Sequence, residues 1–106
     1  MQQYLPLGSV VSLKNSEDGQ KILITNRVPI LEINNEVGYF DYGGCLFPQG
    51  EMKSNFYFND EDIKEVNFYG LTDENEDQIQ ISIENGKKNF RGKHFNVKEL
   101  EGEENE

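Results

Sequence analysis

The sequence predicts a small, mainly β domain, with an α+β domain as the alternative. Short runs in which apolar and polar residues alternate recur along the chain, and this two-residue period is typical of half-buried strands. Asp-Gly and Asn-Gly pairs, which favour tight hairpin turns, separate some of these runs. A chain of 106 residues is large enough for one core, so we expect a small antiparallel sheet or an SH3-like half-open barrel.

The first hairpin is predicted to join strands at residues 10–14 and 21–25. In the first strand, valine and leucine alternate with serine and lysine, which places one face inside the protein. Asp18-Gly19 lies between the strands and tolerates the positive φ of a tight reversal.

Residues 26–38 are less regular and leave two interpretations open. Pro29 interrupts an apolar run and removes a backbone donor, so the segment is either an edge strand or a looped insertion. Asn34-Asn35 is typical of a turn. Strand-like alternation resumes at residues 39–42, and Gly43-Gly44 then indicates a bulge or a close approach of two backbones.

An aromatic strand, one helical turn and another strand are predicted at residues 55–70. Asn59 can cap a helical turn at residues 60–64, because the acids that follow it suit the free N–H groups of a first turn. Alternation then predicts a strand at residues 65–69. The residues that we expect to face inward from the two strands are Phe56, Phe58, Val66 and Phe68.

The C-terminal part is predicted to form a β-hairpin at residues 78–91. Three isoleucines alternate with polar residues ahead of Asn85-Gly86, the pair most diagnostic of a two-residue hairpin turn. The alternative is a helix that gathers on one side Ile79, Ile83 and Phe90. β-branched isoleucines and an internal Asn-Gly pair disfavour that helix.

These elements together predict one domain over residues 1–100. Its core is expected between residues 4 and 70, with the hairpin at residues 78–91 added to it. Residues 101–106 are mostly acidic and are expected to form a disordered tail.

Composition and charge argue against several classes of partner. A formal net charge of −10 disfavours nucleic acid and anionic membranes, which need a basic face, and no segment is long enough to span a bilayer. Cys45 is the single cysteine, so no internal disulfide can form and a reducing compartment is favoured. The first residues lack the features of a signal peptide. We therefore expect a cytoplasmic protein, and its oligomeric state stays open.

No catalytic, cofactor or metal site is predicted. Cys45 lies in an apparent core strand, where a free cysteine behaves as a small hydrophobe, and the single histidine, His94, makes no metal site alone. Four residues fall at ligand positions of an EF-hand loop: Asp73, Asn75, Asp77 and Glu84. The glycine that such a loop needs is replaced by Gln78, so an acidic connector is favoured, and we expect a protein that is not an enzyme.

Three polar or aromatic residues on the outward faces of the predicted strands suggest a protein interface: Tyr57, Asn67 and Tyr69. Outward tyrosines offer a large, fairly rigid contact area with a polar end, which protein interfaces favour. Simple surface exposure is the alternative for each of them.

Three segments, at residues 4–14, 39–50 and 56–70, have the sequences YLPLGSVVSLK, YFDYGGCLFPQG and FYFNDEDIKEVNFYG. Together they resemble the small Gram-positive bacterial family known as domain of unknown function 4176. The resemblance covers the N-terminal two-thirds of the chain, and residues 28–36 and 79–91 depart from the pattern.

That resemblance implies an accessory component of type VII secretion loci that encode LXG-type toxins, and it carries no catalytic residue with it. We expect a non-enzymatic binding protein, such as a chaperone or targeting factor for a secreted toxin. The alternative is an immunity protein that neutralises a basic toxin through its acidic surface.

Overall fold

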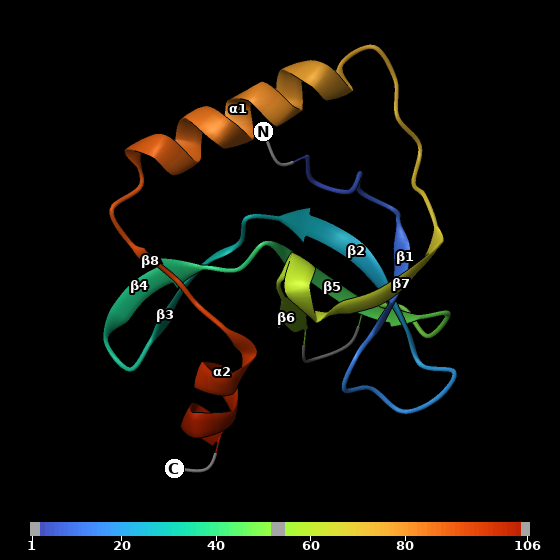
Figure 1. The fold of residues 1–106 in the computed structure, drawn as a ribbon, viewed down its shortest axis with the longest axis horizontal. Helices are drawn as coiled ribbons and strands as arrows, with labels where there is room; N and C mark the ends of the chain where they lie inside the picture. Colours follow the sequence, from blue (N-terminus) through green and yellow to red (C-terminus); the bar gives the residue numbers. More distant parts are fainter. Residues whose placement is uncertain (1–2, 52–54, 105–106) are drawn as a thin grey trace.

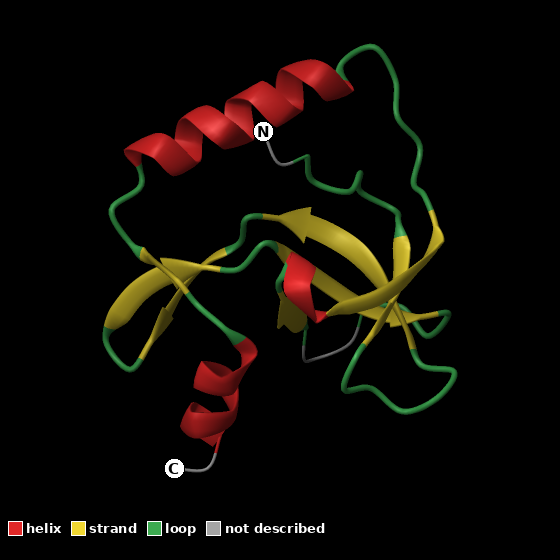
Figure 2. Ribbon diagram, viewed as in Figure 1, coloured by secondary structure: helices red, strands yellow, loops and turns green. Residues whose placement is uncertain are grey.

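Two sheets and two α-helices make up the computed structural model, which describes residues 3–51 and 55–104 (Figure 1). In chain order the elements are β1 (Val10–Leu13), β2 (Lys21–Arg27), β3 (Ile30–Ile33), β4 (Glu36–Tyr39), β5 (Tyr42–Phe47), β6 (Phe56–Phe58), the 3-10 turn η1 (Asp60–Asp62), β7 (Ile63–Phe68), α1 (Glu76–Asn89), β8 (Lys93–His94) and α2 (Val97–Glu104). Strands dominate (Figure 2), which confirms the mainly β prediction.

The larger sheet has five antiparallel strands in the order β6-β5-β2-β1-β7. Its edge strands, β6 and β7, are joined by η1 and do not pair with each other. The sheet therefore stays open and does not close into a barrel. The predicted helical turn is present but shorter than expected, because Ile63 already begins β7.

The uncertain segment at residues 26–38 forms most of a second hairpin, inserted between β2 and β5. β3 and β4 belong to a three-stranded sheet of order β3-β4-β8, and β3 is indeed an edge strand. Asn34 and Asn35 both have positive φ, as a tight hairpin turn requires. Pro29 precedes β3, so its missing backbone N–H removes no hydrogen bond from the pairing of β3 with its neighbour.

The predicted close approach at Gly43-Gly44 is present where β5 pairs with β2. A Cβ on Gly44 would lie 2.3 Å from the Leu23 carbonyl oxygen, so no other residue fits there without movement. The register shifts between Ile24 and Asn26, opposite these glycines.

The predicted C-terminal hairpin at residues 78–91 is wrong, because residues 78–89 belong to α1, in agreement with the alternative interpretation as a helix. Ile79 and Ile81 are both exposed, so the alternation of isoleucines does not mark an inward face. Gln80 is buried instead, and Ile83 packs against the main core. These tertiary contacts outweigh the low helix propensity of isoleucine and of the Asn-Gly pair.

The C-terminal end also differs from the prediction. β8 adds to β4 in parallel, and α2 runs to Glu104, so the tail predicted to be disordered from residue 101 begins as helix. Residues 105 and 106 lie outside the described part of the chain.

Two apolar clusters form the core. The main cluster lies on the five-stranded sheet and contains Tyr4, Val11, Ile22, Ile24, Tyr42 and Phe58. The second lies beside the β3–β4 hairpin and contains Ile33, Phe40 and Phe95. Phe58 is inside as predicted, and Phe56 and Val66 are half-buried against the main cluster.

The inward orientation predicted for Phe68 is wrong, since its side chain is 62% exposed. Val10 pairs with Phe68 whereas Val11 pairs with Val66, which leaves Asn67 as an extra residue in β7. Such a bulge breaks the alternation of faces along a strand, and Phe68 consequently turns outward.

Candidate functional site

A buried network of polar side chains holds together the segments around residues 41, 59 and 95. Asn59 Oδ1 accepts a hydrogen bond from the Asp41 backbone N–H at 2.9 Å, and Asn59 Nδ2 donates to the Phe95 carbonyl at 2.7 Å. Asp41 Oδ2 accepts from the Asp60 N–H at 2.9 Å. The predicted capping residue, Asn59, thus ties three segments together through its side chain.

His94 belongs to the same network, which sequence reasoning did not foresee. Its Nε2 lies 3.0 Å from Asn59 Oδ1 and 3.1 Å from Asp41 Oδ1. Both neighbours are acceptors, so this ring nitrogen is the protonated one. The ring also stacks on Tyr39 at 4.5 Å. These contacts give His94 a structural role.

The structure does not bring the three predicted interface residues together. Tyr57 is in β6 and Asn67 in β7, the opposite edges of the larger sheet. Tyr57 is half-buried against the second cluster, where its ring stacks on Phe40. Asn67 Nδ2 donates to Ser12 Oγ at 2.9 Å. Asn67 is exposed, as is Tyr69, at 65%.

Tyr69 belongs to a different exposed apolar surface, which we call the β7 strip. Its members are Leu7, Phe68, Tyr69 and Leu71, and Leu71 is 88% exposed. They gather because residues 7–9 run against residue 70. The Gly70 N–H donates to Ser9 Oγ at 2.9 Å, and a Cβ on Gly70 would lie 2.1 Å from the Leu7 carbonyl oxygen.

Sequence reasoning missed most of this strip for identifiable reasons. Phe68 was assigned inward by an alternation that the bulge breaks. Leu71 lies between Gly70 and Thr72, and a leucine in that polar stretch is the available signal. Leu7 lies between Pro6 and Gly8, and nothing local places it beside Gly70.

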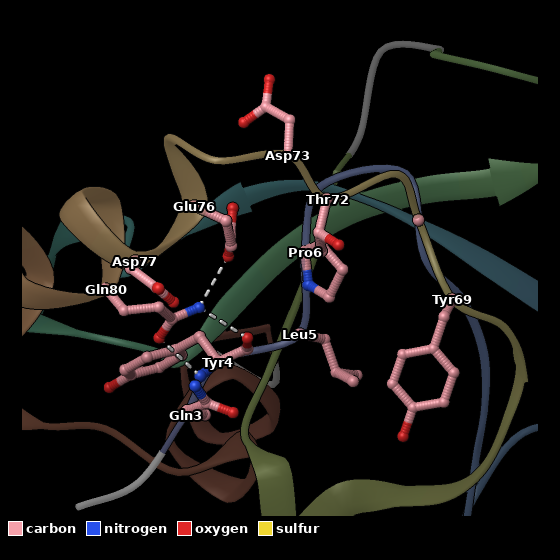
Figure 3. A pocket seen from close by; sticks show the side chains of 11 residues that line it. Gln3, Tyr4, Leu5, Pro6, Tyr69, Thr72, Asp73, Glu76, Asp77 and Gln80 are labelled. Atoms are coloured by element: carbon pink, nitrogen blue, oxygen red, sulfur yellow. Dashed lines mark hydrogen bonds between the residues drawn. The ribbon is translucent and has the colours of Figure 1, made fainter.

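A cleft with a volume of about 480 Å³ adjoins the strip. It lies between residues 3–6, the connector after β7 and the first turns of α1 (Figure 3). Leu5, Pro6 and Tyr69 line it on one side, and Asp73, Asp77 and Gln80 on the other.

The inner wall of the cleft is held by Gln80. Its Oε1 accepts from the Tyr4 N–H at 2.9 Å and its Nε2 donates to the Tyr4 carbonyl at 2.8 Å, as the dashed lines in Figure 3 show. Gln80 Nε2 also donates a hydrogen bond to Glu76 Oε2. Arg27 Nη1 forms an ion pair with the same oxygen at 2.5 Å. Glu76 is therefore neutralised within the fold.

The other two acids of the cleft have no such partner. Asp73 Oδ1 accepts a hydrogen bond from the Asn75 N–H, a neutral donor. Within residues 3–51 and 55–104, no lysine, arginine or histidine lies within ion-pair distance of Asp73 or Asp77. The cleft thus combines apolar and aromatic surface with two uncompensated carboxylates.

The tyrosines behind this region are neutral structural groups. Burial raises the pKa of Tyr42 to about 12, and the Tyr42 hydroxyl accepts a hydrogen bond from the Leu5 N–H at 2.9 Å. Burial also raises the pKa of Tyr4, whose buried hydroxyl has no hydrogen-bond partner among the residues that the structure describes. Lys87 Nζ lies 5.0 Å from the centre of the Tyr4 ring, a cation–π contact that fastens α1.

Three other residues that the sequence analysis considered for catalysis or metal binding lie in regular secondary structure. Cys45 is buried in β5. Asp77 and Glu84 are helical residues of α1 and not positions of an EF-hand loop. Among the residues that the structure describes, no group of three or more His, Cys, Asp or Glu could hold a metal ion, and no helix is long and apolar enough to cross a membrane.

Comparison with known proteins identifies one relationship. A family model described as "Domain of unknown function (DUF4176)" matches residues 4–79. The match covers both sheets except β8 and ends in the first turn of α1. No curated protein and no solved structure gave a match.

Proposed function

The chain belongs to the family known as domain of unknown function 4176, and on this premise we propose that it is a cytoplasmic, non-enzymatic accessory protein. We propose further that it acts as a chaperone or targeting partner of a type VII-secreted toxin of the LXG class. The secretion context derives from the family resemblance of its three motifs.

The observation that carries a binding role is the β7 strip. Leu71 and Phe68, three positions apart in the chain, both expose large apolar side chains, and grouped exposed apolar residues are typical of a site that another protein covers. Full burial of one such side chain contributes about 1.5–3 kcal/mol. Tyr69 adds an aromatic residue with a polar end, a type enriched in interfaces.

A non-enzymatic role is supported by how the polar residues are used. Asp41, Asn59 and His94 hydrogen-bond to one another and to the backbone, and Glu76 is paired with Arg27. A general acid or base needs a free polar atom directed at a substrate, whereas these atoms hold the fold.

Co-purification from the native host tests the proposal. The wild-type chain should recover a toxin or secretion component, and the double variant Phe68→Ser/Leu71→Ser should lose it. Val37→Ser is the matched control, because it removes a side chain that is 50% exposed from the other sheet. Repeated failure of the wild-type chain to recover any such component would sink the proposal.

An immunity protein is the second candidate, favoured by the acidic mouth of the cleft and the net charge of −10. A protein that blocks a basic toxin should bind the toxic, C-terminal region, with an affinity that falls steeply as salt rises. A chaperone should bind the N-terminal region. Truncated toxins, tested separately for binding, distinguish the two roles.

A further inference from the structure

We infer that the β7 strip and the adjoining cleft bind one occupant, a basic segment of the partner protein that carries apolar side chains and at least one lysine or arginine. The inference rests on the proposed function only in that the occupant belongs to another protein. It names the chemistry of that segment and the residues that receive it.

The apolar half of the site requires apolar side chains in the occupant. Leu7, Phe68 and Leu71 are each about half exposed or more, and the fold brings the backbone of Leu7 against Gly70, which lies between the other two in the sequence. Water is released from this surface only if the partner covers it with aliphatic or aromatic groups.

The charged half requires a cation. Of the described residues that line the cleft, Asp73, Glu76 and Asp77 are acidic and none is basic. Arg27 pairs with Glu76, and no basic residue in the described part of the chain pairs with Asp73 or Asp77. A lysine or arginine side chain that enters the cleft would meet Asp77, while Asp73 lies at the rim with its carboxylate directed outward (Figure 3).

Shape and aromatic surface fit the same cation. A volume of about 480 Å³ falls within the range of sites that enclose small groups, about 300–1,000 Å³, so a long side chain has room. Figure 3 shows Tyr69 across the cleft from Asp77. An aromatic face attracts a guanidinium or ammonium group, which Tyr69 offers at 65% exposure.

Charge also argues against a second copy of this chain as the occupant. Another copy would bring its own net charge of −10 to an acidic cleft. Like charges placed face to face at an interface oppose binding, so the occupant must differ in charge from this chain.

Selection of peptides on the full chain tests the inference without knowledge of the partner. The immobilised protein is panned with a display library of random peptides, and the enriched peptides are measured by fluorescence anisotropy. The enriched sequences should combine lysine or arginine with leucine, phenylalanine, tyrosine or tryptophan.

Substitutions then locate the binding site. Asp73→Asn/Asp77→Asn should weaken binding of the selected peptide about tenfold and reduce its dependence on salt. Leu71→Ser should weaken it by a similar factor. Asp18→Asn, in the exposed β1–β2 turn, and Val37→Ser are the matched controls and should change affinity less than twofold. All five positions are exposed, so the variants should keep the thermal midpoint of the wild type.

Three outcomes would overturn the inference: no enriched sequence, enrichment of neutral or acidic peptides, or binding that the Asp73, Asp77 and Leu71 variants leave unchanged. A partner recovered by co-purification that binds these variants as tightly as the wild type would also overturn it, while the proposed function would stand. Conversely, basic apolar peptides that bind at this site would support the inference even if no toxin were recovered.

Discussion

Gln80 holds a segment that lies 76 residues earlier in the chain. Its amide pairs with both the N–H and the carbonyl of Tyr4, as a neighbouring strand would do. Nothing in the sequence singles it out, because a glutamine between two isoleucines reads as the polar position of an alternating strand. Its role depends on where α1 lies, which local patterns do not encode.

We predict that Gln80→Ala lowers the free energy of unfolding by about 2–4 kcal/mol, since it leaves two backbone groups of Tyr4 without partners in a buried place. Chemical denaturation measures the change. Gln78→Ala, on the exposed side of the same helix, is the control and should cost less than about 0.5 kcal/mol. Equal effects of the two substitutions would contradict the role of Gln80.

A substitution at Tyr4 should increase the free energy of unfolding, in contrast to Gln80→Ala. Its hydroxyl is buried, and no described residue forms a hydrogen bond with it, so Tyr4→Phe should raise the free energy of unfolding by about 1 kcal/mol at neutral pH. Tyr69→Phe, at an exposed position, should change nothing measurable.

The same substitution should alter the response to alkali. Burial raises the pKa of Tyr4 above its ordinary value of 10, so above pH 10 the unfolded chain releases a proton that the folded chain keeps. Stability is therefore full below pH 10 and falls as pH rises beyond it. Denaturation curves between about pH 9 and pH 11 should show a shallower decline for Tyr4→Phe than for the wild type. An unchanged slope would contradict the prediction.

At the scale of elements, α1 shows where local patterns mislead. Asn85-Gly86 is a strong hairpin signal, yet Gly86 is a helical residue with no atom within 4 Å of its would-be Cβ. The β1–β2 hairpin and the Asn34-Asn35 turn were predictable, because turn chemistry and strand alternation agree there. In α1, turn chemistry and strand alternation both indicate a hairpin, which is wrong. The helix forms because Gln80, Ile83 and Lys87 contact residues that are distant in the sequence.

Gly86→Ala tests the helix directly. In an exposed helical position alanine is favoured over glycine, so the free energy of unfolding should rise by about 0.5–1 kcal/mol. In a hairpin turn with positive φ the same substitution would be destabilising. Gly19→Ala serves as the comparison, because Gly19 has a φ of +85° in the β1–β2 turn, and it should lower stability.

The outward orientation of Phe68, which follows from the bulge in β7, can be tested by substitution. Phe68→Ser should change the free energy of unfolding by less than about 0.5 kcal/mol, since the side chain is mostly in water. Phe58→Ala, in the fully buried position of β6, should cost about 3–5 kcal/mol. A large loss of stability in Phe68→Ser would show that Phe68 faces inward, and the β7 strip would then lose its central member.

The fold class of the whole molecule was predictable from the sequence, whereas the arrangement of its two sheets was not. Alternation and turns indicate a single β-rich body, and three motifs indicate the family. The second sheet was not foreseen, because its third strand, β8, contributes only Lys93–His94 in parallel to β4, too short for a pattern. The proposed binding surface was likewise only partly predictable, since Leu7 comes to lie against Gly70 through the fold and not through sequence spacing.

Net charge gives a prediction for the molecule as a whole. A folded chain of charge −10 repels itself, and salt screens that repulsion. Raising sodium chloride from about 20 mM to about 0.5 M should increase stability by about 1 kcal/mol, which corresponds to about 4–8 °C in the thermal midpoint. A fall in the midpoint would mean that attractive pairs such as Arg27–Glu76 outweigh the repulsion.

The position of the N-terminal segment under α1 has a consequence for synthesis on the ribosome. Tyr4 is translated long before Gln80, and β1 long before its edge partner β7. Until those later residues emerge, the backbone of Tyr4 has only water to bond with, and one edge of β1 stays open. The nascent chain therefore completes its fold late, after α1 has been translated, and does not mature strand by strand.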